Sequence, residues 1–139
     1  MKKGLLLLLL LALQGCAPYY LVDSQLSGLQ PGLNMQQVQG QLAKKPSAEF
    51  PVTGLDGLYA VQVYHVLTDQ TQQMTVSCGQ YGCIPIMYTE PVTEPFAFVF
   101  QDDKLIAWGF VDALRKHPNG EINRVGAAVA VELQKRGNI

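Results

Sequence analysis

The sequence has 139 residues, with 10 Lys or Arg, 11 Asp or Glu, and a formal net charge of −1. This length suits one domain with a modest core. A near-neutral chain without a basic stripe cannot neutralise many phosphates, so we expect no nucleic-acid partner.

The N-terminus has the pattern of a bacterial lipoprotein signal peptide. Two lysines precede a leucine run over residues 4–13. This run is too short to span a bilayer, which needs about 20 apolar residues. The tetrapeptide Leu-Gln-Gly-Cys at residues 13–16 resembles a lipobox, in which the cysteine is acylated with diacylglyceryl and palmitate groups. We therefore expect lipidation at Cys16, and an ordinary secretory cleavage is the alternative.

Removal of residues 1–15 leaves 124 residues. Without Lys2 and Lys3, eight basic residues face 11 acidic ones, a formal charge of −3 once the amino terminus is acylated. We divide this chain into a lipidated tether at 16–31 and a single domain at 32–139. Ala17 follows the cysteine where aspartate is the inner-membrane retention signal of enteric bacteria. We expect a lipid-anchored protein of the outer membrane that faces the periplasm.

A first helix is predicted from Asn34, whose side chain can cap it while Gln37 reaches back to the cap. Apolar residues recur at helical spacing as far as Leu42, and Pro46 prevents continuation. So short a helix is marginal alone and must pack on another element.

Residues 58–67 alternate like a strand, and residues 72–88 are predicted to form a hairpin whose tip is Gly79-Gln80-Tyr81-Gly82. After lipidation of Cys16, Cys78 and Cys83 remain as a pair, which we interpret as a disulfide in an oxidising compartment. A redox pair is less favoured because Cys-x-x-Cys is absent. A zinc site is least favoured because the two histidines do not supply a ligand pattern.

We expect a loop at 89–95, where prolines recur, and then a hairpin over 96–110 with its turn at Asp102-Asp103-Lys104. After a Pro-Asn-Gly break, Ile122, Val125, Val129 and Leu133 predict an amphipathic helix over about 121–135. The order helix, antiparallel strands, helix indicates an α+β fold.

Besides the lipobox upstream, residues 29–110 combine four motifs: a helix start of the form Gly-Leu-Asn-x-x-x-Val-x-x-x-Leu, a following proline, an aromatic strand and a closing Phe-x-Phe-turn-Leu hairpin. They fall on Gly32, Leu33, Asn34, Val38, Leu42, Pro46, Tyr59, Phe98, Phe100 and Leu105. This set resembles the SmpA/OmlA (BamE-like) family of bacterial outer-membrane lipoproteins.

The resemblance implies two layers, with helices on one face of a small antiparallel sheet, and a partner in the barrel-assembly machinery. This sequence departs from the family at three points: Leu33 stands for the usual methionine, one residue is added before Pro46, and Tyr59 lies near a common tryptophan. The cysteine-bearing hairpin and the last helix have no counterpart.

The sequence contains no Gly-x-Ser-x-Gly elbow, His-Glu-x-x-His or P-loop, and we expect neither catalysis nor a cofactor or metal. Asp102 and Asp103 suit a turn better than an acid pair. We expect a non-catalytic binding or scaffold protein of the envelope, whose contact includes Tyr59, Tyr64 and Trp108. A lipid-anchored enzyme with a scattered site and a small-lipid-binding protein are the alternatives.

We predict that Cys16→Ser removes the lipid and blocks lipoprotein processing, because only the thiol of this residue can accept the diacylglyceryl group. Mass spectrometry of the membrane fraction checks this. The wild-type mature chain should carry acyl groups and cofractionate with the outer membrane, and a soluble, unacylated wild-type chain would contradict the prediction.

Overall fold

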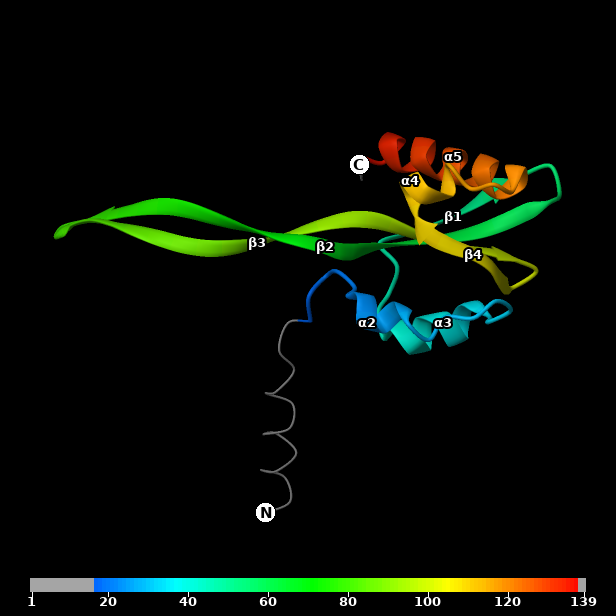
Figure 1. The fold of residues 1–139 in the computed structure, drawn as a ribbon, viewed down its shortest axis with the longest axis horizontal. Coiled ribbons are helices and arrows are strands. Elements are labelled where there is room, and N and C mark those ends of the chain that lie inside the picture. The colour runs from blue at the N-terminus through cyan, green and yellow to red at the C-terminus, as the bar shows by residue number, and fades with distance from the viewer. Residues whose placement is uncertain (1–16, 138–139) are drawn as a thin grey trace, which may run out of the picture.

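The computed structural model describes residues 17–137, so Cys16 and the leucine run lie outside the described residues. Four strands form one antiparallel sheet in the order β1-β2-β3-β4, with helices on both sides (Figure 1). This confirms the α+β class with a C-terminal helix. The elements are α2 (Asp23–Leu26), α3 (Met35–Leu42), β1 (Ala48–Thr53), β2 (Leu58–Gly79), β3 (Gly82–Gln101), β4 (Lys104–Phe110), α4 (Val111–Leu114) and α5 (Gly120–Lys135).

The body of the protein has three layers, which corrects the two-layer expectation. On one face of the sheet, Val61 and Val99 pack with residues of α4 and α5. On the other face, Phe98 and Phe100 pack with residues of α3 and the N-terminal segment. All five residues of 96–100 are buried, and strands with consecutive buried residues need cover on both faces. One helical layer could not have covered this sheet.

Helix α3 begins with the predicted capping box. Asn34 Oδ1 accepts from the Gln37 backbone N–H at 2.8 Å, and Gln37 Oε1 accepts from the Asn34 N–H at 2.9 Å. The carboxylate of Asp103 accepts from the Met35 N–H at 3.2 Å, so the β3–β4 turn supplies a negative charge to the helix N-terminus. This bond fixes the N-terminus of α3 beside the β3–β4 turn.

Helix α5 packs through the predicted stripe, with Val125, Val129 and Leu133 fully buried. Asn119 caps it by accepting from two backbone N–H groups of the first turn. A Cβ atom on Gly126 would lie 2.7 Å from the backbone carbon of Leu114. A glycine is therefore needed where α4 and α5 come together.

The segment expected to be a free tether at 16–31 is docked to the sheet from Leu21 onward. Leu21 is fully buried, its N–H donates to the His65 carbonyl at 2.7 Å, and its carbonyl accepts from the Leu67 N–H at 2.9 Å. Here β2 extends beyond the end of β1, and its backbone groups need partners. Leu21 supplies them while filling the core, and α2 follows.

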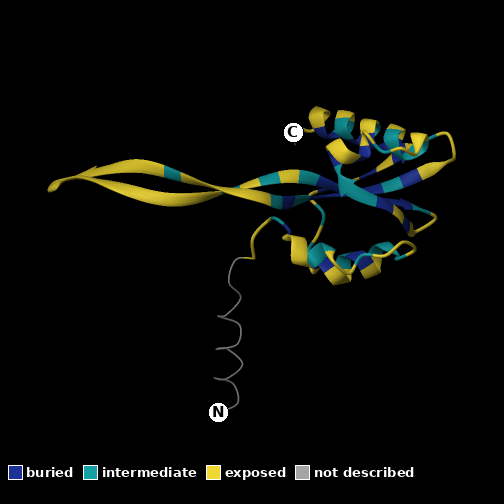
Figure 2. Ribbon diagram, viewed as in Figure 1, coloured by how far each residue is buried: buried dark blue, intermediate teal, exposed yellow. Residues whose placement is uncertain are grey.

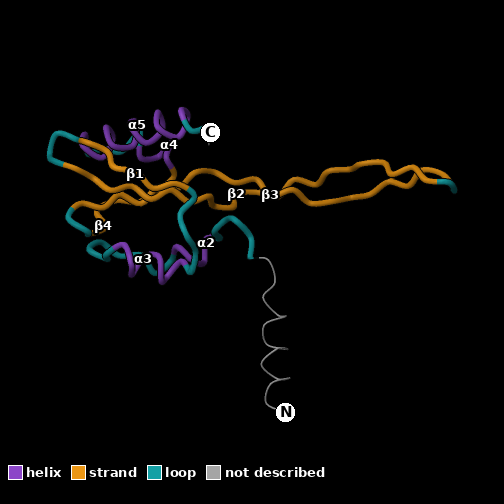
Figure 3. Tube along the Cα trace, turned by 180° about the vertical axis from the view of Figure 1, so that it is seen from behind, coloured by secondary structure: helices purple, strands orange, loops and turns teal. Residues whose placement is uncertain are grey.

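Residues 89–95, expected to form a loop, belong to β3. Strands β2 and β3 continue as a pair far beyond the body, and the helices do not cover this extension (Figures 1 and 3). The loop was predicted because prolines recur in this segment. In a two-stranded ribbon both strands are edges, and an edge strand tolerates proline wherever its amide would point outward.

We predict that Val129→Asp lowers the free energy of unfolding by about 3 kcal/mol or more, because it buries an unpaired charge against the sheet. Val131, on the same helix, is 52% exposed. Val131→Asp should therefore change the stability by no more than about 0.5 kcal/mol. Thermal or denaturant unfolding measures both, and equal melting temperatures for Val129→Asp and wild type would show that α5 does not pack on the sheet.

Candidate binding surface

Two of the three aromatic residues expected at a contact surface are buried in the body. Tyr59 is 2% exposed and Tyr64 is 1% exposed, while Trp108 is half-buried against the α3 side of the core. Tyr59 faces α5 and Tyr64 faces the opposite layer. The exposure expected for Tyr59 and Tyr64 was wrong because strand alternation identifies two faces but not which of them a helix covers.

The hydroxyl groups of both tyrosines have partners within the body. Tyr59 donates to Glu121 Oε1 at 3.1 Å, and Tyr64 donates to the Lys44 carbonyl at 3.3 Å. Burial, with the Glu121 carboxylate beside it, raises the pKa of Tyr59, whereas burial raises the pKa of Tyr64 to about 12. The backbone N–H of Asp56 holds the pKa of Glu121 below its usual value. Tyr59 and Asp56 therefore join the β1–β2 region to Glu121 of α5, which is a structural role.

The two histidines and the acidic pair of the β3–β4 turn lie in separate local settings. The His65 ring lies 6.4 Å from that of Tyr19, and His117 Nδ1 accepts from the Asn119 backbone N–H. Asp102 and Asp103 have φ of 51° and 58°, which confirms their place in a tight turn. Within residues 17–137, no group of three His, Cys, Asp or Glu side chains could hold a metal ion.

The hairpin predicted over residues 72–88, with its tip at residues 79–82, is present. Sequence reasoning missed that it is longer and projects from the body, and we call the projecting part, Asp69–Val92, the arm. Nearly all of its residues are exposed (Figure 2). At about 3.3 Å per residue, the arm is roughly 35 Å long. Its only charged residues are Asp69 and Glu90, so residues 70–89 carry no charge. That uncharged run, with a cysteine pair near its centre, was the available signal.

The two faces of the arm both carry exposed apolar side chains. The register pairs Met74 with Met87 and Val76 with Pro85, so these four share one face, which we call the methionine face. The next residues along each strand point the other way, and the isoleucine face comprises Ile84, Ile86, Tyr88 and Val92. Met74 and Ile84 are 65% and 64% exposed, values unusual for side chains of this size in a soluble protein.

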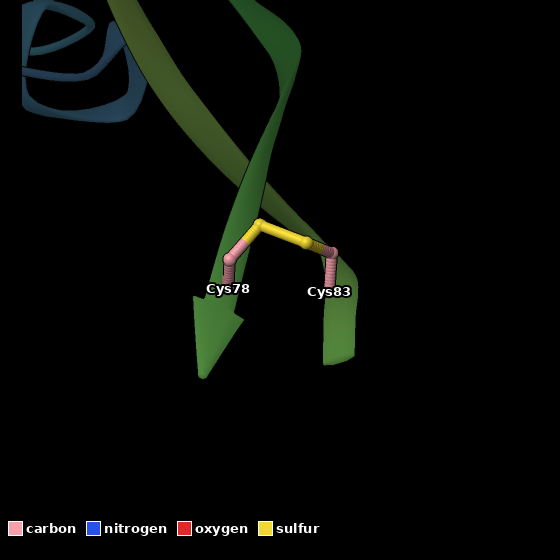
Figure 4. Close-up of a disulfide and its surroundings, with 2 residues drawn as sticks. All are labelled: Cys78 and Cys83. Carbon is pink, nitrogen blue, oxygen red and sulfur yellow. A yellow bond between two sulfur atoms is a disulfide. The ribbon is translucent and has the colours of Figure 1, made fainter. Parts of the chain in front are cut away.

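A disulfide joins Cys78 of β2 to Cys83 of β3 beside the tip (Figure 4). The predicted cysteine pairing is therefore present in the structure. So small a ring contributes only about 2 kcal/mol through loop entropy. Its place matters more than its size, because a two-stranded ribbon is marginal in water and this bond keeps the free end paired.

No family model, curated protein or solved structure matches this chain. Membership of the SmpA/OmlA family stays a prediction. Among the described residues, no helix has the length and apolar character needed to cross a membrane.

We predict that stability falls as pH rises from about 10 toward 12, because Tyr64 keeps its proton in the folded state after its unfolded counterpart would lose it. The sign follows from the raised pKa: the folded state binds more protons over this range, so rising pH favours unfolding. Denaturant titrations at several pH values measure the slope. Tyr64→Phe should make it shallower, and an unchanged slope in this variant would contradict the assignment.

Proposed function

We propose that this protein is a lipid-anchored, non-catalytic binding or scaffold protein of the outer membrane, and that it contacts an envelope protein through the arm. The observation that carries the proposal is the combination of an uncharged, apolar, projecting hairpin with a body whose sheet is covered on both faces. The body uses its large aromatic side chains for its own core. The apolar side chains of the arm do not pack into either core cluster of the body.

Exposed apolar patches on soluble domains typically mark interaction sites, since leaving them in water is unfavourable. The isoleucine face offers Ile84, Ile86 and Tyr88 side by side along β3, with Thr75 and Gln73 opposite them on β2. This mixture of apolar contact area and neutral hydrogen-bonding groups suits a protein interface.

A protein partner fits the arm better than the hydrocarbon interior of a bilayer. A two-stranded ribbon has two open edges whose backbone groups need hydrogen-bond partners, and lipid chains provide none. A protein surface or water can satisfy these groups. The lipid at Cys16, rather than the arm, then provides the membrane attachment in this proposal.

The docked N-terminal segment supports a working position close to the membrane. Leu21 is only five residues after Cys16, and five extended residues span at most about 18 Å. A lipidated chain would therefore hold the body near the bilayer surface, with the arm reaching beyond it. Such confinement raises the effective concentration of membrane-bound partners, so a modest interface suffices.

The resemblance to the SmpA/OmlA family supports a narrower version of the proposal. The lipobox, the capped helix start and the closing hairpin favour an accessory role in outer-membrane protein assembly or envelope integrity. The arm and α5 are the parts of this chain without a counterpart in that resemblance. Of these two parts, the arm carries the exposed apolar side chains, so it is where a partner particular to this protein would be contacted.

Photo-crosslinking in intact cells tests the proposal. A crosslinking residue at Tyr81, 98% exposed at the tip of the arm, should capture an envelope protein. The matched control is Leu55, 74% exposed in the β1–β2 turn of the body, which should capture little. Ile84→Glu should strongly reduce capture at Tyr81 by placing a charge in the contact, whereas Val131→Asp on α5 should leave it unchanged.

Equal capture at Leu55 and Tyr81, or capture that Ile84→Glu leaves intact, would contradict an arm-mediated contact. The enzyme alternative has its own readout. If the purified protein turned over an envelope substrate and His65→Ala abolished turnover without changing the melting temperature, the non-catalytic proposal would be wrong.

A further inference from the structure

The outer edge of β2, on the side away from β3, is covered in two steps and then left open. Strand β1 pairs with it from Leu58 to Val63. Leu21 then bonds to His65 and Leu67. From Asp69 to Gly79, no described residue pairs with this edge. The arm thus offers 11 consecutive residues of unpaired strand.

The outward-pointing amides of this edge can be assigned from the ladder. In an antiparallel pair, directly opposed residues alternate between hydrogen-bonded pairs, with Cα atoms about 5.5 Å apart, and closer pairs whose backbone groups point outward. The Cα atoms of Cys78 and Cys83 are 3.9 Å apart, which marks a close pair. Alternation then gives outward amides to every second residue of β2 from 70 to 78.

The prolines of β3 support this assignment and distinguish the two edges of the arm. Pro85 and Pro91 lie opposite Val76 and Gln70, so both occupy positions whose amide would point outward. Proline has no N–H to donate, and at these positions it weakens the outer edge of β3 as a site for strand addition. Residues 68–79 of β2 contain no proline. The open edge of β2 therefore keeps all its donors.

We propose that this edge pairs in an antiparallel manner with the same edge of a second copy of the protein, giving a four-stranded ribbon in which the two β2 strands are central. A two-fold axis makes such a pairing self-complementary. Residues 70–89 contain no charge, so two copies can align without opposing like charges. The open edge runs from Asp69 to Gly79, and its midpoint sets the register at Met74.

The side chains suit this register on both faces of the ribbon. Met74 would oppose Met74 of the second copy, with Met87 flanking on each side, so a row of four methionines crosses the methionine face. On the other face Thr71 would oppose Ser77, and Gln73 would oppose Thr75. Hydroxyl and amide pairs of this kind are favourable across strands. Only the outer edges of the two β3 strands would remain open, and Pro85 and Pro91 weaken these as sites for further strand addition.

This inference goes beyond the proposed function and does not depend on it. Self-pairing uses the backbone edge of β2, whereas the proposed partner contacts the exposed side chains of the arm. A strand pair of this length is a small interface, and lipid anchoring in one membrane would favour it by confinement.

Cysteine crosslinking in intact cells tests the register. In the proposed dimer, the Cα atoms at position 74 are about 5.5 Å apart, within disulfide range, so Met74→Cys should form a covalent dimer under mild oxidation. Met87→Cys is the matched control. Its two copies would be three strand spacings apart, about 14 Å, and should not crosslink. The wild-type chain gives the background from the native cysteines.

Proline substitution tests the backbone bonds. In the full-length protein solubilised in detergent, Met74→Pro removes two symmetric hydrogen bonds and should weaken dimerisation roughly 30-fold. Met87→Pro, on the blocked edge of β3, should have little effect. Near-ultraviolet circular dichroism confirms that the body stays folded in each variant. A monomer at all concentrations, equal crosslinking at positions 74 and 87, or capture of a different protein by Met74→Cys would overturn the proposal.

Discussion

One ladder between β2 and β3, irregular only between Leu67 and Asp69, supports the whole molecule. It runs from the pair Ala60 and Phe100 in the body to Gly79 and Gly82 at the tip of the arm. In the body, this pair is the centre of the sheet, and β1, β4 and both helical layers assemble on it. In the arm, the same two strands have no further cover, and their own ladder is supported only by the sheet at one end and the disulfide at the other.

This division separates stability from recognition. Buried residues such as Val63, Phe98 and Val129 belong to the body, where a polar substitution is costly. The arm contributes no residue to either core cluster. Its side chains are therefore constrained by the partners they contact and not by packing within the domain. Its composition follows from that freedom: threonine, glutamine, methionine and isoleucine favour strands or neutral contacts without adding net charge.

The elements predicted from the sequence were those with local signals. The capping box spans only the four residues from Asn34 to Gln37. The α5 stripe repeats within one helix, and the Asp102-Asp103 turn needs only its own backbone. The features that were predicted wrongly depend on contacts between residues far apart in the sequence. The sequence around Tyr59 and Tyr64 does not indicate which helical layer covers each side chain. Likewise, no residue near Leu21 in sequence indicates that β2 needs a backbone partner at that point. The extent of the arm was likewise hidden, because its prolines are read as breaks unless the edge they occupy is known.

The independence of the arm from the core also makes its length adjustable. Loss of one residue from each strand would shorten it by about 3.3 Å and transfer every side chain beyond that point to the opposite face. Loss of two from each would shorten it by about 7 Å and restore the faces. The body would fold identically in every case. Such a hairpin is a graded spacer, which insertions and deletions in pairs can match to a new distance without redesign of the domain that carries it.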